Sequence, residues 1–197
     1  MERITCKRLT KQKVSEVAFQ KFNDLTTGVF PVPVDTILES KFGISIIPIP
    51  GLKASLRQYS EEEAFLNRGC TEIYIDEDMY MDQFVNRWRF TLAHELAHVI
   101  LHKSVFGKIK NQNDFITLYS EKNNIEALSW IETQADWFAS FFLMPTAEMK
   151  KILGEVYSLN EPEDVVGERV KNKLIAHFGV SAQSAKKRVE NYLRDNF

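Results

Sequence analysis

The sequence predicts an α+β fold, in which a small antiparallel sheet near the middle of the chain is preceded and followed by helices. Apolar residues recur at helical spacing before residue 43 and after residue 84, whereas short stretches of alternating apolar and polar residues gather from 43 to 78. The chain has 197 residues, of which 44% are hydrophobic and 26% charged, enough for a buried core. We expect a main domain at 1–157 and a helical, helix-turn-helix-like appendage at 158–197.

The first part of the chain contains two expected helices, at 11–25 and 34–42, and Gly43 ends the second one. Strands are expected at 43–51, 54–60 and 71–78, with a polar segment at 61–69. Pro48 and Pro50 either confine the first strand to an edge of the sheet or end it. The third strand is either an edge to which an extended peptide could pair or the middle of the sheet.

The rest of the chain is expected to be mainly helical. The expected helices span 84–101, 125–143, 146–156, 160–178 and 181–193. Pro145 stops the second of these, Asn160 with Glu163 opens the fourth, and Ser181 caps the last. The polar segment 103–124 is long for a structureless connection, so we expect a surface flap with one short helix.

Composition excludes several classes of protein. A net charge of −2 provides no overall attraction to nucleic acid or to an anionic membrane. Apolar runs stay shorter than the roughly 18–20 residues of a membrane span, and the charged N-terminus lacks an apolar signal segment. Cys6 and Cys70 are too few for a disulfide framework or a cysteine-based zinc site, so we expect free thiols and a cytoplasmic protein.

The stretch RFTLAHELAHVILH at 89–102 contains the pattern H-E-x-x-H at His94, Glu95 and His98. One helical turn separates the two histidines, so both imidazoles can reach a single Zn²⁺ from one face of the helix. Glu95 projects about 100° further round, where it could accept a proton from a metal-bound water that attacks a peptide carbonyl. The helix is apolar nearly all round, so burying these groups without a metal partner would be costly. A chance match is expected in about one chain in a hundred of this length.

A catalytic zinc site needs a third protein ligand, and three candidates compete. His102 lies about 12 Å of helical rise beyond His94 and cannot share the metal, so we interpret it as a polar residue near a helix end. Glu132 and Asp136 lie one turn apart on an apolar helix, with the spacing of a gluzincin-type zincin. Glu132 could bind zinc while Asp136 accepts a hydrogen bond from a ligand imidazole; the alternative is an exposed acidic face. Glu126 is the weaker third candidate.

Three blocks in order resemble the ImmA/IrrE family of metallopeptidases. They are RFTLAHELAHVILH, IETQADWFASFFLMP and HFGVSAQSAKKRVENYL, and together they span residues 89–193. The resemblance implies a zinc-dependent endopeptidase of bacteria and their mobile elements, which relieves repression by cleaving a helix-turn-helix repressor. It implies that His94, His98 and Glu132 bind zinc and that Glu95 is the catalytic base. The chain departs from the family pattern at Gln134, where a second glutamate is frequent, and Ala97 replaces a frequent glycine.

Other features are less specific. Tyr74, Tyr119 and His177 could stabilise an oxyanion, but each is as readily explained by structure. The basic residues of the last helix could contact phosphates; these are Lys186, Lys187, Arg188 and Arg194. Glu190 and Asp195 interleave with them, which favours a solvated face or a surface for docking a repressor over direct DNA binding.

A second hypothesis is a metal-containing regulator that binds a repressor or toxin partner without cleaving it. The intact Glu95 argues against it, because a structural metal site needs no base. A toxin that hydrolyses something other than protein is a third. The primary prediction is a zinc endopeptidase that acts on a protein substrate.

Overall fold

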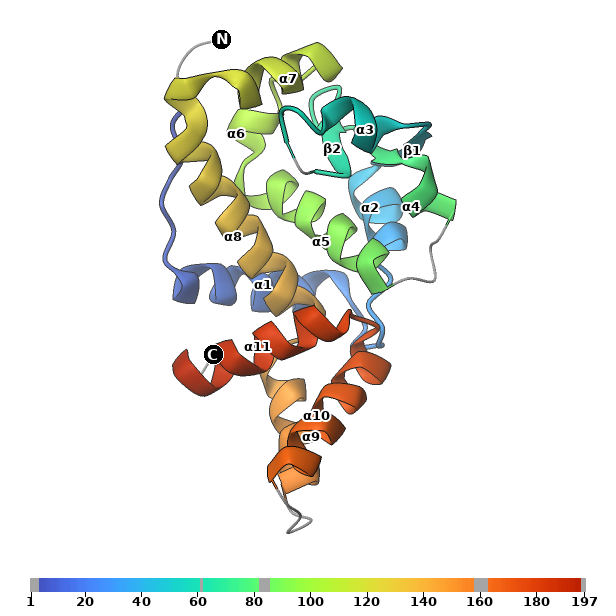
Figure 1. Ribbon diagram of the computed structural model, residues 1–197, viewed down its shortest axis with the longest axis vertical. Helices are drawn as coiled ribbons and strands as arrows, with labels where there is room; N and C mark the ends of the chain where they lie inside the picture. Colours follow the sequence, from blue (N-terminus) through green and yellow to red (C-terminus); the bar gives the residue numbers. More distant parts are fainter. Residues whose placement is uncertain (1–3, 61, 82–85, 158–162, 196–197) are drawn as a thin grey trace.

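In the computed structural model, residues 4–60, 62–81, 86–157 and 163–195 are described, and helices surround one three-stranded sheet, which confirms the α+β prediction (Figure 1). The strands are β1 (Ser45–Ile49), β2 (Ala64–Asn67) and β3 (Glu72–Asp76), in the order β1-β3-β2. The sheet is mixed rather than antiparallel, because β3 runs parallel to β1 and antiparallel to β2. The chain reverses through β2 before it enters β3, so the first and last strands share a direction.

Two expectations about the strands were wrong, and the structure decides between the two alternatives for the third strand. The segment expected as a strand at 54–60 overlaps helix α3 (Leu52–Leu56), where Leu52 and Leu56 are buried four residues apart at helical spacing. Strand β2 lies in the stretch expected to be a polar connection, and all four of its residues are buried. Strand β3 is the middle of the sheet, so it offers no edge to a peptide. Helix α4 (Glu77–Met81) directly follows it.

The first two helices follow their sequence signals. Helix α1 (Lys11–Leu25) begins after Thr10, whose side chain accepts a hydrogen bond from the Lys13 N–H, and packs along α8. Helix α2 (Val34–Phe42) ends at Gly43, which has φ of 64°, a left-handed conformation that glycine adopts without strain. Helix α2 contacts both β1 and α5, so it joins the sheet to the helices behind it.

Helices α5 (Asn86–Leu101) and α8 (Ile125–Leu143) pack side by side at the centre of the molecule, and α8 also lies against α1 (Figure 1). Both helices bury apolar side chains along most of their length, as their sequences predict. The expected start of the first of them at Phe84 lies outside the described residues. This pairing brings the two motif-bearing segments of the chain face to face.

The connection between α5 and α8 is more helical than the expected flap. It contains α6 (Lys103–Phe106), α7 (Gln112–Ser120) and the short 3-10 helix η1 (Lys122–Asn124). The side chains of Phe106, Ile109 and Phe115 are almost completely buried, and the Phe115 ring stacks on Phe65 of β2 with centroids 4.6 Å apart. The apolar residues of this segment therefore anchor it to the sheet.

Helices α9 (Thr146–Tyr157), α10 (Glu163–Phe178) and α11 (Ala182–Asp195) gather at the end of the molecule remote from α7 (Figure 1). The Asn160 helix start lies outside the described residues, and the division at 157/158 stays a prediction. Gly179, with φ of 60°, forms the turn between α10 and α11. A Cβ there would lie 2.8 Å from Pro31 Cγ and 2.9 Å from Arg89 Nη1, so the turn is seated closely against the rest of the chain.

Arg188 of α11 is fully buried, so the expectation that it could contact DNA phosphates was wrong. Its Nε donates to the Met144 carbonyl at 3.2 Å, its Nη2 donates to Thr146 Oγ1 at 2.8 Å, and its guanidinium lies 4.7 Å from the centre of the Phe141 ring. It ties α11 to the end of α8 and the start of α9. None of the helices in the described ranges is long and apolar enough to cross a membrane.

Candidate metal centre

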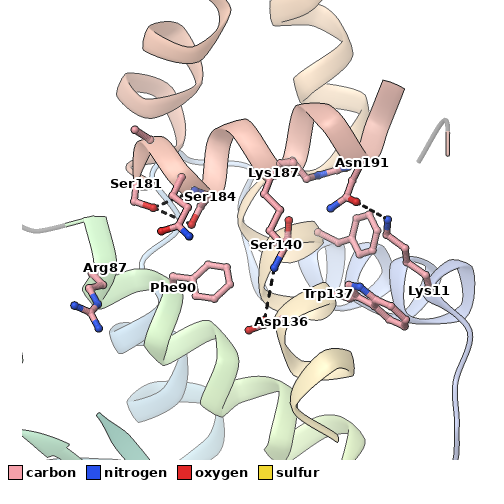
Figure 2. Close-up of a pocket in the computed structure, with 14 residues that line it drawn as sticks. Lys11, Arg87, Phe90, Asp136, Trp137, Ser140, Ser181, Ser184, Lys187 and Asn191 are labelled. Atoms are coloured by element: carbon pink, nitrogen blue, oxygen red, sulfur yellow. Dashed lines mark hydrogen bonds and ion pairs between the residues drawn. The ribbon is translucent and has the colours of Figure 1, made fainter. Parts of the chain in front are cut away.

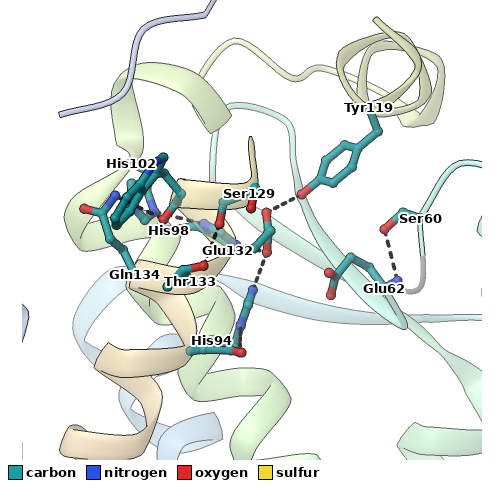
Figure 3. A network of polar contacts seen from close by, with 12 residues as sticks. Ser60, Glu62, His94, His98, His102, Tyr119, Ser129, Glu132, Thr133 and Gln134 are labelled. Carbon is teal, nitrogen blue, oxygen red and sulfur yellow. Dashed lines mark hydrogen bonds and ion pairs between the residues drawn. The ribbon is translucent and has the colours of Figure 1, made fainter. Parts of the chain in front are cut away.

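Helices α5 and α8 bring two histidines and one glutamate together (Figure 3). His94 Nε2 lies 2.8 Å from Glu132 Oε2, and His98 Nε2 lies 3.6 Å from the same oxygen. One ligand-type atom from each of these three residues can be chosen such that all lie within 4.8 Å of one another, close enough to hold a single metal ion. These are the three residues that the sequence predicted to meet.

The second ring nitrogen of each histidine is also engaged. His94 Nδ1 lies 3.1 Å from Asp136 Oδ1, the contact that the sequence predicted for this aspartate. His98 Nδ1 lies 3.1 Å from His102 Nδ1. With both Nδ1 atoms held from outside, the two Nε2 atoms point toward Glu132.

His102 follows the last residue of α5, near the helix end as expected, and makes a further contact that the sequence did not indicate. It is not one of the three clustered residues, in agreement with the geometric argument against it. It is also only 4% exposed, because the chain turns at His102 from α5 into α6 and directs its ring toward His98. Its ring supports a neighbouring histidine more than it serves a helix dipole.

The donor set fits zinc. Two imidazole nitrogens and one carboxylate oxygen are ligands that Zn²⁺ prefers, and three protein ligands are typical of an open, catalytic site. If His98 binds a metal through Nε2, its Nδ1 carries the proton and donates a hydrogen bond to His102 Nδ1. The proton of His102 then sits on Nε2, a buried atom with no hydrogen-bond partner among the described residues.

The charges of these four side chains influence one another. Burial would raise the pKa of Glu132, but the nearby rings of His98 and His94 outweigh it and hold this pKa well below its usual range. Burial would likewise lower the pKa of His94, yet its hydrogen bonds with Asp136 and Glu132 raise it well above its usual range. Burial lowers the pKa of His98, and burial together with His98 lowers that of His102 to about 3. Glu132 is therefore ionised and His102 neutral at pH 7.

Glu95 lies beside this cluster and is only 3% exposed. It accepts a hydrogen bond from the backbone N–H of Leu66 on β2, while its Oε2 has no hydrogen-bond partner among the described residues. Burial raises the pKa of Glu95 to about 8; the charge of His94 opposes this and that of Glu62 adds to it. A buried carboxyl oxygen without a partner, next to ligand-type atoms, is a group with unused proton-accepting capacity.

Glu62 was missed by sequence reasoning. It precedes β2, and in Figure 3 its carboxyl group faces Glu132 across the site. Burial, followed by the charge of Glu132, raises the pKa of Glu62 to about 7. It belongs to the acidic run at 61–63, and nothing in that run relates it to residues on α5 and α8. Three glutamates around two histidines favour a bound cation.

The other residues weighed from the sequence occupy different places. The Tyr119 hydroxyl donates to Glu132 Oε1 at 2.5 Å, so Tyr119 of α7 holds the glutamate that faces the histidines. Tyr74 packs against Phe65, and the His177 ring packs between Phe30 and Phe178. Glu126, at the exposed start of α8, pairs with Arg8 and takes no part in the cluster.

Gln134 is fully buried and makes hydrogen bonds with the backbone. It stands at the position where the ImmA/IrrE family, which the sequence resembles, frequently has a second glutamate. Its Oε1 accepts from the Leu9 N–H at 3.2 Å, and its Nε2 donates to the Trp130 carbonyl at 3.1 Å. It therefore fastens the N-terminal segment to α8 rather than facing the site.

Comparison with known proteins agrees with this geometry. Residues 40–190 match the family model Peptidase_M78, described as the IrrE N-terminal-like domain. No curated protein sequence matches the chain significantly. Among solved structures, a Mycobacterium tuberculosis transcriptional regulator is similar, with 16% sequence identity and a TM-score of 0.54. The match covers 89% of this chain and 54% of the other, so this chain spans about half of that structure's length, and the likeness concerns the fold alone.

Because the family model covers most of the chain and its predicted metal-binding residues lie together, the protein belongs to the IrrE N-terminal-like family of metallopeptidases.

Proposed function

We propose that the protein is a zinc-dependent endopeptidase that cleaves a helix-turn-helix transcriptional repressor in the cytoplasm and thereby relieves repression. One observation carries the proposal: the side chains of His94, His98 and Glu132 converge beside a buried Glu95 oxygen that has no partner in the described parts of the chain. A structural metal site requires the convergence but not the adjacent base.

Each residue has a distinct task in this proposal. His94, His98 and Glu132 hold zinc, which when bound polarises a peptide carbonyl and lowers the pKa of water. Glu95 accepts a proton from the attacking water at its unpartnered Oε2 and passes it to the leaving amine. Its pKa of about 8 describes the metal-free site, and a cation placed beside it would lower that pKa toward the ionised form that a base requires. Asp136 and His102 keep the two imidazoles turned toward the metal.

The proposed substrate class is supported by the family resemblance and by the description of a solved structure with a similar fold. ImmA/IrrE proteins, which the sequence resembles, act on repressors, and the similar solved structure is described as a transcriptional regulator. The exposed charged face of α11, with Lys186 and Glu190, suits docking to a protein more than to DNA, since it carries both signs of charge.

The test is incubation of the zinc-loaded protein with purified helix-turn-helix repressors encoded beside its gene. We expect a discrete cleavage of one repressor that a chelator abolishes and added zinc restores, and that Glu95→Gln protein does not perform. A stable, uncleaved complex with zinc present would refute the peptidase proposal in favour of a regulator that sequesters its partner. Direct binding of the repressor's operator DNA by this protein would contradict the assignment of α11.

A further inference from the structure

A cavity of about 730 Å³ is lined by residues of α1, α5, α8 and α11; we call it the α11 cavity (Figure 2). Asp136 lines it, and the other face of the same carboxylate contacts His94 of the metal centre at 3.1 Å. The cavity is therefore separated from the proposed zinc ligands by one side chain. Its volume suits a few residues of a bound peptide.

Most of the charged side chains that line the α11 cavity are basic. Four basic side chains and one acidic one line it, and they are Lys11, Arg87, Lys187, Arg188 and Asp136. The whole chain, in contrast, has a net charge of −2, so the positive charge at this place is local. The cavity also has apolar walls formed by Phe90 and Trp137, which could cover the methylene groups of a bound side chain.

Among the basic residues, Lys187 is the best placed to meet a ligand. Its ammonium lies 3.9 Å from Asp136 Oδ2, too far for a hydrogen bond, and its side chain is 68% exposed. Such an exposed ion pair contributes little to stability, so exchanging Asp136 for a ligand carboxylate costs little. Arg87, which lies on the opposite wall, is held by Glu63 at 2.6 Å, so Glu63 largely balances its charge and Lys187 remains the principal cation for a ligand.

We propose that the α11 cavity is a specificity subsite that binds an acidic side chain of the peptide substrate, with Lys187 as its principal partner. The inference rests on the proposed peptidase function and adds a preference to it. A peptide that crosses the metal centre would carry an aspartate or glutamate a few residues from the cleaved bond, at the distance between the two sites. Because Lys187 contacts the partner of His94, occupation of the cavity also bears on the orientation of that imidazole.

The experiment uses two pools of quenched fluorescent peptides that are amidated at the C-terminus and random except for one fixed position, which is glutamate in one pool and lysine in the other. The zinc-loaded wild-type protein should cleave the glutamate pool with a kcat/KM about fivefold to tenfold higher at low salt, and the difference should shrink at high salt. Lys187→Glu should remove or reverse this preference, and Lys187→Arg should keep it.

Lys186→Glu is the matched control. It makes the same charge change on the neighbouring residue, whose side chain is 73% exposed and points toward Glu190 rather than the cavity. This variant should keep the wild-type preference. Zinc content, measured for each protein, separates a lost preference from a lost metal, since Lys187→Glu places a new anion near Asp136.

The experiment distinguishes failure of the subsite from failure of the peptidase function. If the zinc-loaded wild type cleaves both pools equally, or if Lys186→Glu and Lys187→Glu change the preference alike, the subsite is refuted and the peptidase function stands. If neither pool is cleaved, the incubation with repressors decides the peptidase function, and binding decides the subsite alone. In that case, binding of the labelled pools to Glu95→Gln protein is measured by fluorescence anisotropy. The subsite requires tighter binding of the glutamate pool than of the lysine pool, and Lys187→Glu should abolish the difference. Equal binding of the two pools refutes the subsite.

Discussion

The metal centre and the contact around Arg188 both bury charged side chains, yet they use them in opposite ways. Between α5 and α8, His94, His98 and Glu132 point at one another, and neighbouring atoms of Glu95 and His102 have no partner among the described residues. Where α11 meets the end of α8, Arg188 donates to a backbone carbonyl and a threonine hydroxyl. Arg188 is the largest of the fully buried side chains in the described chain.

Unused hydrogen-bonding capacity, more than burial, distinguishes a functional buried charge from a structural one. Burial alone does not mark a site, because Arg188 is more completely buried than Glu95. Convergence on one point with hydrogen-bonding capacity left over marks the metal centre, whereas bonding to the backbone of neighbouring elements marks a structural tie.

Replacing Glu95 with glutamine should abolish activity while sparing the metal. We expect kcat/KM for peptide cleavage to fall about a thousandfold or more, because the amide cannot accept the proton of the attacking water. Zinc content should match the wild type. Glu126→Gln, on the exposed start of α8, is the control and should leave both quantities unchanged. Activity of Glu95→Gln within tenfold of the wild type would show that the unpartnered oxygen has no catalytic role.

Removing the glutamate of the cluster should release the metal. Glu132→Ala takes away one of three proposed ligands, so zinc affinity should fall about a hundredfold or more, as measured by competition with a chromogenic chelator. Glu126→Ala, the matched acid on the same helix, should keep wild-type affinity. Unchanged affinity in Glu132→Ala would remove this residue from the ligand set.

Breaking the structural tie should affect stability but not the metal. Arg188→Met leaves the Met144 carbonyl and the Thr146 hydroxyl without their donor, so the free energy of unfolding should fall by about 2 kcal/mol. Arg194→Met, on an exposed side chain of the same helix, should change it by less than about 0.5 kcal/mol. Urea unfolding measures both. A zinc affinity that falls with Arg188→Met would mean that the two buried-charge regions are not independent.

Loosening one imidazole should weaken metal binding moderately. Asp136→Asn keeps the size of the side chain but weakens its hydrogen bond with His94 Nδ1, so zinc affinity should fall about tenfold. This effect should be smaller than that of Glu132→Ala. An equal or greater loss would indicate that Asp136 itself binds the metal.

The pH dependence of the metal-free protein should report on Glu95. Its pKa of about 8 is raised in the folded state, so its contribution to stability is present at low pH and is lost as the pH rises from the ordinary glutamate range through 8. We expect the free energy of unfolding in the presence of chelator to fall between pH 6 and 8 by up to about 1 kcal/mol per pH unit. Glu95→Gln should show a shallower slope, and equal slopes for the two proteins would contradict the buried, unpartnered state of Glu95.

The parts of the molecule that the sequence predicted are those set by regular spacing within long helices. His94 and His98 share a face because four residues make about one turn, and the apolar surroundings of Glu132 marked it as a buried acid. The short elements were not predictable in this way. Leu52 and Leu56 fit a strand or a helical turn until Gly51 and the sheet decide between them, and β2 has only four residues between acids and a turn.

The partners of the metal centre come from elements whose approach no local pattern encodes. Glu62 precedes β2, and Tyr119 lies on α7, in a segment that the sequence presented as a polar flap. The sequence did not indicate the burial of Arg188, because two exposed lysines precede it. In the structure it is buried because its guanidinium donates a hydrogen bond to the Met144 carbonyl at the end of α8. Hydrogen bonds of this kind, between a side chain and the backbone of a distant element, depend on tertiary packing and leave no periodic signal in the sequence.

The hydrogen bond from Tyr119 also bears on how many oxygens of Glu132 would bind a metal. One oxygen of Glu132 is engaged by the phenol at 2.5 Å, and the other faces the two histidines. If Glu132 binds zinc as proposed, a carboxylate held in this way would offer the metal one atom more readily than two. Three protein donors would then leave a fourth tetrahedral position for solvent or substrate. A tyrosine outside both sequence motifs would thus influence how many coordination positions the protein leaves open.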